Sequence, residues 1–403
     1  YFAGGFVRGL TKKEIKKLIQ NFIDAAVRVK KSGCDGVQLH ASHGYLLQQF
    51  LSPHTNRRTD EYGGSLENRM RFILEIIAGI KDKCGKDFPV IVRLTVDECY
   101  EKIGYPDRGY KLEDGVKMAK ILEKAGIDAI EVHGDRLLGS LCSKTLNHRE
   151  DNYGGSLENR VRYALEVVKA IKEAAPNLLI EYKLPFITTN PDGTDRGKGG
   201  LHEEDGIAFA KMLEEAGVHM IQVAQANHTG NMADTIPPMG TREYNWMLPI
   251  TKRVKEVVNI PVAVVGKVVS VENGEKILAD GDADIICYGR SLLCDPDIAN
   301  KVATDEPIRE CLQCNKGCVD AIQGRRYISC ILNAENGDEG TIFIKPADEK
   351  KNVVIVGAGI AGLEAARVAA LRGHHVDVYE NTYKCPICGY IEHSYPEKYT
   401  ELE

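Results

Sequence analysis

The chain has 403 residues, with 52 Lys plus Arg against 58 Asp plus Glu, which gives a formal net charge of −6. This balance argues against a nucleic-acid-binding surface. An apolar fraction of 43% with only 15 Pro can form a large core and excludes a disordered or collagen-like chain. No stretch approaches the roughly 20 apolar residues of a membrane span, and the first residues lack the apolar segment of a signal peptide. We therefore expect a cytoplasmic globular protein of two or three domains that binds neither nucleic acid nor a membrane.

Helical periodicity alternates with short β-branched runs along most of the chain, and helices are predicted over Thr11–Ser32 and Ser65–Lys83. The predicted strands are Gly36–His40, Val90–Thr95, Ala129–His133, Leu179–Leu184, Met220–Ala224, Val262–Gly266 and Asp284–Tyr288. Strands that alternate with helices form a parallel sheet, and so many consecutive units favour a (β/α)₈ barrel. One strand of the eight is missing from this count. Since the sequence opens on a helix, we expect the first strands of the barrel to lie upstream of residue 1.

The sequence contains an internal repeat, in which residues 33–83 correspond to residues 126–174. Within it, Asp60–Lys81 and Asp151–Lys172 are identical at 14 of 22 positions. One interpretation is a duplicated strand-helix arm within the barrel. The other is a join between two related sequences, which would make the chain chimeric.

The composition changes after the last strand-helix unit. We assign residues 1–305 to an incomplete barrel, 306–340 to a cysteine-rich segment, 341–351 to a charged linker, and 352–380 to the first βαβ unit of another domain. The tail, residues 381–403, contains Cys385-Pro-Ile-Cys388-Gly, which resembles half of a zinc-ribbon knuckle. A single CxxC pair cannot complete a site of four thiolates.

The cysteine-rich segment contains the strongest chemical signal. Cys311-x2-Cys314-x3-Cys318 is followed by Cys330, and four thiolates at such spacings can hold an iron-sulfur cluster. Zinc is the alternative, although zinc sites usually have two CxxC knuckles. The six cysteines elsewhere have no ligand spacing, and most are expected to be buried: Cys34, Cys84, Cys99, Cys142, Cys287 and Cys294.

A second signal is Gly357-x-Gly359-x-x-Gly362, which directly follows an apolar strand and opens a helix. The glycines allow a pyrophosphate to approach the helix N-terminus. Glu380 ends a second strand 23 positions after Gly357, where an acid can hydrogen-bond a ribose hydroxyl. This pattern predicts a dinucleotide site, and the alternative is a tight turn without a ligand.

A third signal follows the first predicted strand, where His40-x-x-His43-Gly-Tyr45 lies at the carboxyl end. In a barrel this end carries the active site, so two imidazoles could polarise a carbonyl while a phenol delivers a proton. Histidines at a strand end are also found as packing residues, and the motif alone does not decide between the two.

The segment HASHGYLLQQFLSPHTNRRTDEYGGSLENR resembles the active-site segment of Old Yellow Enzyme-type flavin oxidoreductases. CLQCNKGC followed by SCILN and the dinucleotide pattern resembles the larger branch, with 2,4-dienoyl-CoA reductase, enoate reductases and bile-acid-inducible steroid oxidoreductases. The resemblance covers most of residues 10–380. It implies an FMN-binding TIM barrel, a 4Fe-4S cluster, and an FAD- and NAD(P)H-binding domain that supplies electrons through the cluster to FMN.

The resemblance also implies roles for single residues. Tyr45 corresponds to the proton donor, and His40 with His43 to the pair that holds the carbonyl oxygen of the substrate. Arg93 corresponds to the basic residue beside the flavin pyrimidine, and Lys183 is its counterpart in the second repeat. The positions that match the phosphate-binding residues are Gly266, Lys267, Gly289 and Arg290.

The second repeat departs from the family because it has no tyrosine at the position of Tyr45, although it keeps His133 and offers Arg136. The implied reaction is NAD(P)H-dependent reduction, or the reverse desaturation, of a C=C bond conjugated to a carbonyl in an enoyl or steroid substrate. An amine dehydrogenase of the same architecture and a non-catalytic electron-transfer fragment are the alternatives. The choice of NADH or NADPH, the substrate, the repeat that forms the site and a homo-oligomeric state stay open.

Overall fold

The structure is a computed structural model that describes residues 8–100, 104–105, 108–134, 137–227, 232–342 and 344–380. The chain divides into two compact units, Tyr1–Asn333 and Ala334–Glu403. The cysteine-rich segment up to Cys330 therefore belongs to the same unit as the predicted barrel. The predicted half-knuckle at Cys385 and Cys388 lies outside the described residues, as does Arg136.

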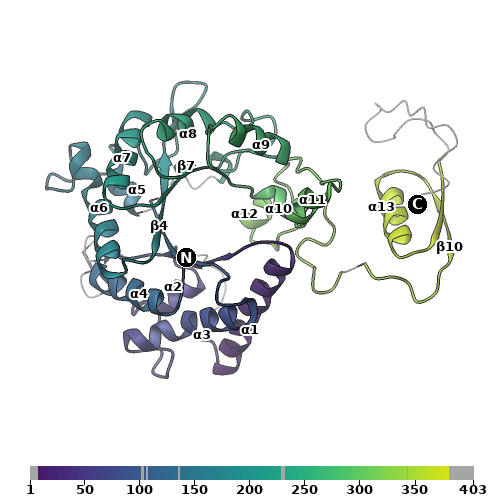
Figure 1. The fold of residues 1–403 in the computed structure, drawn as a ribbon, viewed down its shortest axis with the longest axis horizontal. Helices are drawn as coiled ribbons and strands as arrows, with labels where there is room; N and C mark the ends of the chain where they lie inside the picture. The colour runs from purple at the N-terminus through teal and green to yellow at the C-terminus, as the bar shows by residue number, and fades with distance from the viewer. Residues whose placement is uncertain are drawn as a thin grey trace. The chain divides into compact units, whose positions relative to one another are not determined.

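The first unit is built on a seven-stranded sheet in which all neighbouring strands are parallel. The strands follow one another in the order β1-β2-β3-β4-β7-β8-β9, and the helices lie on the outer side of the curved sheet (Figure 1). Their bounds are β1 Val37–Ala41, β2 Val90–Leu94, β3 Ala129–His133, β4 Leu179–Phe186, β7 Met220–Gln225, β8 Val262–Val264 and β9 Ile285–Ile286. All seven predicted strands are confirmed. The short antiparallel pair β5 (Thr188–Thr189) and β6 (Asp195–Arg196) was not expected.

The helices of the first unit begin where the sequence supplies capping residues. Thr11 caps the first helix in a capping box with Glu14, while Ser65, Ser156 and Ser270 accept hydrogen bonds from the first turns of three later helices. The α-helix bounds are α1 Lys12–Lys31, α2 Leu46–Leu51, α3 Leu66–Cys84, α4 Leu112–Lys124, α5 Leu137–Cys142, α6 Leu157–Ala174, α7 Glu203–Glu215, α8 Leu248–Lys255, α9 Val271–Ala279, α10 Arg290–Cys294, α11 Ile298–Thr304 and α12 Val319–Gln323. A 3-10 turn, η2, spans Met232–Asp234.

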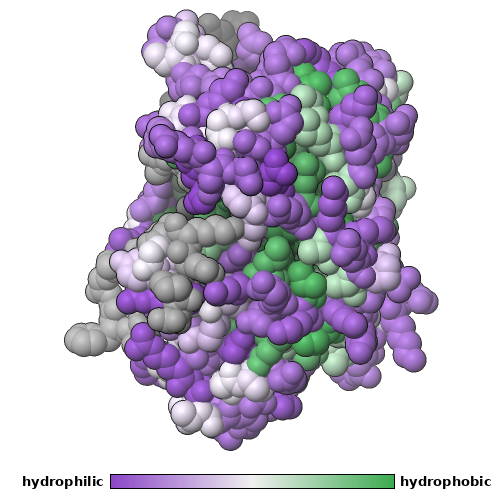
Figure 2. All heavy atoms as spheres, turned by 90° about the vertical axis from the view of Figure 1, so that its left-hand side faces the viewer, coloured by the Kyte–Doolittle hydropathy of each residue, from purple (hydrophilic) through white to green (hydrophobic). Residues whose placement is uncertain are grey.

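The apolar side chains of these elements face one another between the sheet and the helices. Alternate strand residues such as Val90, Val92 and Leu94 are buried with the inner faces of the helices in one hydrophobic core. Hydrophilic side chains cover most of the face shown in Figure 2, with hydrophobic ones confined to a band between them. Within the described ranges, every helix is too short or too polar to cross a bilayer.

The other residues of the same strands point to the inner face of the sheet, and several of them are polar or charged. It includes Gln38 and His40 on β1, Arg93 on β2, Glu131 on β3 and Glu181 on β4. These side chains hydrogen-bond from strand to strand: Arg93 Nε on β2 and Gln38 Nε2 on β1 both donate to Glu131 Oε2 on β3. The sheet therefore separates an apolar layer from a polar inner face.

The internal repeat folds twice into the same arrangement of strand, short helix, long helix and strand. The loop between the two helices is held by Asn56 in the first copy, which donates to Phe50 O and Tyr62 O at 2.7 Å each. In the second copy Asn147 donates to the equivalent carbonyls of Leu141 and Tyr153. The copies stand side by side, because β2 pairs with β3. The repeat is therefore a structural duplication within one sheet, as the first interpretation expects.

The second unit contains a parallel βαβ element, formed by β10 (Asn352–Val356), α13 (Ile360–Leu371) and β11 (His375–Tyr379). β10 and β11 pair directly along five residues. This is the arrangement predicted from the glycine pattern at 352–380.

We predict that Asn56→Ala destabilises the protein by about 1–3 kcal/mol, because two buried carbonyl oxygens lose their hydrogen-bond donor. Urea unfolding followed by circular dichroism measures this change. Asn152→Ala is the matched control, since this exposed asparagine lies in the equivalent loop of the second copy and should leave the free energy of unfolding within about 0.5 kcal/mol. Equal stability of the two variants would show that the Asn56 hydrogen bonds do not hold the loop.

Candidate functional site

The carboxyl end of β1 brings three predicted catalytic side chains together. The His43 Nδ1 and His40 Nε2 atoms are 3.1 Å apart, and the Tyr45 ring lies edge-on to the His40 ring with centroids 5.1 Å apart. Tyr45 begins helix α2 and is 47% exposed. The chain can turn this sharply because His43 and Gly44 both adopt positive φ, at 60° and 75°. The structure thus places an accessible phenol beside two imidazoles.

The hydrogen bonds around His40 define its tautomer. The Ser42 backbone N–H donates to His40 Nδ1 at 3.2 Å, which leaves the ring proton of a neutral His40 on Nε2, facing His43 Nδ1. Burial lowers the pKa of His40, and the nearby positive charge of Arg93 lowers it further. His40 is therefore neutral near pH 7, and the neutral form of His43 carries its proton on Nε2.

Arg93 neighbours His40 in the sheet register. Its guanidinium is fixed by Glu131, with Nε at 2.8 Å and a second nitrogen at 2.7 Å from Oε2. The Glu131 carboxylate is fully buried and also contacts Gln38 Nε2 at 2.9 Å and His133 Nδ1 at 2.9 Å. Although burial acts to raise its pKa, hydrogen bonds to His133 and Arg93 lower it to about 2.

Glu181 is the next carboxyl group along the inner face, and its pKa is shifted in the opposite direction. Burial and the neighbouring negative charge of Glu131 raise the pKa of Glu181 to about 7. Its carboxyl oxygen Oε1 accepts a long hydrogen bond of 3.4 Å from Gln222 Nε2. Two adjacent carboxyl groups with separated pKa values are thus built into the inner face, and sequence reasoning found neither of them.

The second repeat contributes to the same region. His133 lies next to Lys183 in the strand register, and its ring centroid is 4.4 Å from that of His43. The two copies therefore meet at one place, with His43 from the first and His133 from the second. A cavity of about 470 Å³ adjoins them, and its lining residues include Asp97 and Tyr163.

The predicted phosphate-binding residues follow β8 and β9. A side chain at Gly266 would meet Met247 Cγ at 2.8 Å, so only glycine fits there. Lys267 follows, and its Nζ donates to the carbonyl of Arg242. Gly289 precedes α10, and Arg290 donates to Pro237 O at 3.0 Å and Asn315 Oδ1 at 2.6 Å. These positively charged residues lie at the carboxyl side of the sheet, where barrels bind phosphate.

All four predicted cluster cysteines line one cavity of about 340 Å³. They are Cys311, Cys314, Cys318 and Cys330, and each is a free thiol. Among the described residues no group of His, Cys, Asp or Glu side chains converges on a single metal ion.

Two further residues of this cavity were missed. Cys294, expected only to be a buried thiol, is buried, but it also lines the cavity and hydrogen-bonds to the Cys330 side chain. Arg290, expected at a phosphate, lines the same cavity. The place of Cys294 at this cavity is hard to recognise from the sequence, because Cys294 lies 17 residues before Cys311 without ligand spacing.

In the second unit, the glycine-rich turn has the features of a dinucleotide loop. Gly357 adopts φ +102°, and a side chain at Gly362 would meet the Gly357 carbonyl oxygen at 1.8 Å. The Glu380 carboxylate accepts a hydrogen bond of 2.7 Å from the Ala358 backbone N–H. The backbone between β10 and α13 thus lies close to the acid predicted to bind a ribose. Gly359 is the N-cap residue of α13.

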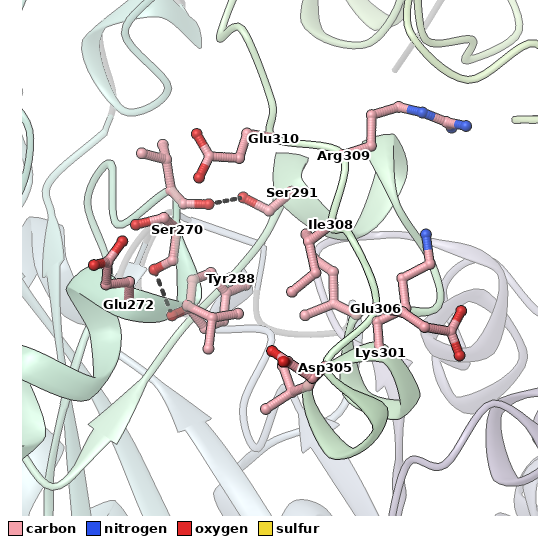
Figure 3. Close-up of a pocket in the computed structure, with 14 residues that line it drawn as sticks. Ser270, Glu272, Tyr288, Ser291, Lys301, Asp305, Glu306, Ile308, Arg309 and Glu310 are labelled. Carbon is pink, nitrogen blue, oxygen red and sulfur yellow. Dashed lines mark hydrogen bonds between the residues drawn. The ribbon is translucent and has the colours of Figure 1, made fainter.

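A wider cleft of about 930 Å³ lies elsewhere, between the β8–α9 loop and α11 (Figure 3). Tyr288 and Ser291 line it and donate to the backbone carbonyls of Ser270 and Val269, while Lys301, Glu306 and Glu310 give it mixed charge. None of the predicted catalytic residues lines this cleft, so its size does not make it the candidate active site.

The sequence profile of the NADH:flavin oxidoreductase / NADH oxidase family matches residues 3–105 and 112–308. The chain belongs to this family. It is 55% identical over 272 residues, 67% of this chain, to a bilirubin reductase of Mediterraneibacter gnavus. It is 32% identical over 393 residues, 94% of this chain, to a cinnamate reductase of Clostridium sporogenes. The chain spans 42% and 45% of the lengths of these relatives.

The fold is also similar to that of 6-hydroxypseudooxynicotine amine oxidase from Pseudomonas geniculata, with a TM-score of 0.68 and 20% identity. This likeness covers 91% of the present chain and 58% of that one. At this identity the likeness concerns the fold alone.

We predict that the contribution of Glu181 to stability falls as pH rises from about 4.5 to about 7. Over this range an unfolded Glu181 loses its proton while the folded one, whose pKa is raised to about 7, keeps it. The loss is about 3.5 kcal/mol at most, since each pH unit between the two pKa values contributes about 1.4 kcal/mol. Glu181→Gln should remove this part of the pH dependence.

Urea unfolding of both proteins across this pH range is the measurement, with the exposed Glu215→Gln as the control. If Glu181→Gln and the control both keep the wild-type slope of stability against pH, the raised pKa of Glu181 is wrong.

Proposed function

We propose that this chain forms the flavin site of an NAD(P)H-dependent reductase that acts on a C=C bond conjugated to a carbonyl. The observation that carries the proposal is the grouping of Tyr45, His40 and His43 at the carboxyl end of β1, beside Arg93. Membership of the flavin oxidoreductase family and the similarity to a cinnamate reductase support it. The substrate is an enoyl, enoate or steroid-type small molecule.

The residues at the carboxyl ends of the strands fit FMN. Lys267 and Arg290 supply positive charge for the phosphate, with Gly266 and Gly289 allowing close approach of the backbone. Arg93, held by Glu131, presents a fixed positive charge beside the ring system, with Lys183 of the second copy on the same face. When bound, FMN supplies the hydride to the β-carbon of the substrate.

The substrate is oriented by its carbonyl oxygen. His43 carries its proton on Nε2 because Nδ1 accepts from His40, and this N–H can donate to the carbonyl oxygen. The donor polarises the conjugated bond and stabilises the negative charge that develops on the oxygen. Neutral imidazoles are suited to this role, which agrees with the lowered pKa of His40.

Tyr45 provides the proton for the α-carbon. It is exposed enough to meet a substrate, and its ring lies edge-on to His40. A phenol placed beside the α-carbon can donate its proton as that carbon gains negative charge. The second copy has no tyrosine at this position, so we assign catalysis to the first copy.

The cysteine cavity fits a 4Fe-4S cluster, held by Cys311, Cys314, Cys318 and Cys330. Such a cluster passes single electrons. The Arg290 guanidinium at the same cavity offsets the negative charge of the thiolates. The turn at Gly357 and Gly362 with Glu380 suits FAD, and NAD(P)H is the electron source that the complete arrangement implies.

We predict that Tyr45→Phe slows reoxidation of the chemically reduced, FMN-loaded chain by cinnamate about a hundredfold, because the proton donor is lost. Stopped-flow absorbance of the flavin measures this rate. Reoxidation by ferricyanide needs no proton on carbon and should be unchanged.

Tyr105→Phe is the matched control, since this tyrosine is also 47% exposed and lies outside the β1 site. Undiminished reoxidation of Tyr45→Phe by cinnamate would remove Tyr45 as the donor. A chain that binds FMN yet is not reoxidised by any enoyl compound would contradict the proposed reaction.

We predict that anaerobic reconstitution with iron and sulfide gives about four irons per chain and a broad visible absorbance. Cys314→Ser should lower the iron content, because one of four thiolate ligands is lost, whereas Cys34→Ser should not, since Cys34 is a free thiol outside the cavity. Retention of a single zinc ion, or equal iron in both variants, would contradict the cluster.

A further inference from the structure

Three loops at the carboxyl side of the sheet bring cationic side chains around one tryptophan. The Arg196 and Arg242 guanidinium carbons each lie 5.5 Å from the Trp246 ring centroid. Arg196 ends β6, after β4, while Arg242 and Trp246 lie between β7 and α8. Lys267 follows β8 and donates to the carbonyl of Arg242. We call these four residues the Trp246 cluster.

The cations of the Trp246 cluster are held by uncharged oxygens. Arg196 donates to the carbonyls of Ala233 and Asp234, Arg242 to the carbonyl of Thr189 and the amide oxygen of Asn190, and Lys267 to the carbonyl of Arg242. In the part of the chain that the structure describes, none of the three forms an ion pair with an Asp or Glu side chain.

The positive charges also act on one another. Burial lowers the pKa of Arg196, and Arg242 lowers it further, against an opposing effect of Asp234. The pKa of Lys267 is lowered by burial, then by Arg290 and Arg196. Bringing like charges together away from water destabilises the fold, unless an anion binds between them.

Two buried donors of the cluster lack an acceptor. The Trp246 Nε1 and Arg242 Nε atoms are inaccessible to solvent and have no hydrogen-bond partner among the described residues. Trp246 Nε1 lies close to the backbone turn at Gly266. A Cβ atom at position 266 would be 3.2 Å from this nitrogen. A buried donor without an acceptor destabilises the folded protein, and a ligand oxygen that accepts its hydrogen bond would remove this penalty.

We propose that the Trp246 cluster is a binding site for a carboxylate or phosphate group of a ligand. Arginine is suited to such groups because its planar guanidinium can donate two parallel hydrogen bonds. Arg196 and Arg242 both lie 5.5 Å from the Trp246 ring centroid, and Lys267 adds a third charge. The anion comes from the flavin phosphate or from an acidic substrate. This inference deepens the proposed function, but its test requires neither flavin nor turnover.

The experiment uses Trp246 as the reporter, because it is the only tryptophan in the chain. Inorganic phosphate is titrated into the full chain while tryptophan fluorescence is recorded, with NaCl at equal ionic strength as the reference. We expect a saturable change with phosphate that NaCl does not produce.

Arg196→Gln and Arg242→Gln should each weaken phosphate binding by about tenfold or more, because a charged hydrogen-bond donor is lost. Arg253→Gln is the matched control, since Arg253 pairs with Glu203 and Glu204 at the surface. Circular dichroism shows whether each variant is folded, and two independent variants guard against a local folding defect.

Further titrations separate the two sources of the anion. If the flavin phosphate occupies the site, FMN competes with phosphate, and Arg242→Gln weakens FMN but not riboflavin. If a substrate carboxylate occupies it, phosphate still binds to the FMN-saturated chain, and cinnamate binds in its place whereas cinnamyl alcohol does not. Either result supports an anion site.

The proposal is overturned if phosphate and cinnamate give no saturable change beyond that of NaCl, or if both variants bind phosphate as tightly as Arg253→Gln. Either outcome is independent of catalysis. If the chain binds phosphate through Arg242 but does not reduce enoyl compounds, the proposed reaction is wrong and the anion site is still supported.

Discussion

The arrangement of the inner face of the sheet depends on the hydrogen bonds and the ion pair of the fully buried Glu131 carboxylate. It holds Arg93 through two nitrogens, contacts Gln38 on β1 and faces His133 at the end of its own strand. A buried charge is tolerated only when partners surround it, and removing one of them is costly. The negative charge of Glu131 also helps to keep Glu181 protonated near neutral pH, so one carboxylate orients Arg93 and sets the protonation of its neighbour.

The duplicated arm explains why so many ionisable groups meet in one place. Each copy has a histidine at or next to the end of its first strand and a basic residue in its second strand, and the two copies are neighbours in the sheet. Duplication therefore brings His43 and His133 into ring contact and places Arg93 between His40 and Glu131. Only the first copy has a tyrosine at the position of Tyr45. The two copies therefore share a scaffold but differ in the chemical groups that they present.

The strands and helices were predictable because short β-branched runs, as in Val90–Leu94, alternate with helical periodicity, and because capping residues such as Thr11 mark the helix starts. The grouping of His40, His43 and Tyr45 was predictable from one short segment. The role of Glu131 was not, since its partners Gln38, Arg93 and His133 lie on three strands and meet only through the sheet register. The Trp246 cluster was missed for the same reason, because Arg196, Trp246 and Lys267 belong to separate loops. Cys294 carried no ligand spacing at all.

The central claim is that the inner face of this sheet, together with its carboxyl-end loops, binds FMN next to Tyr45. Equilibrium titration of the chain with FMN, followed by the visible flavin spectrum, tests it most directly. The account predicts saturation at one FMN per chain, with a shifted flavin band. It also predicts about tenfold or more weaker binding when Arg93→Ala removes the fixed positive charge beside the ring. Absence of saturable FMN binding by the wild-type chain would contradict it.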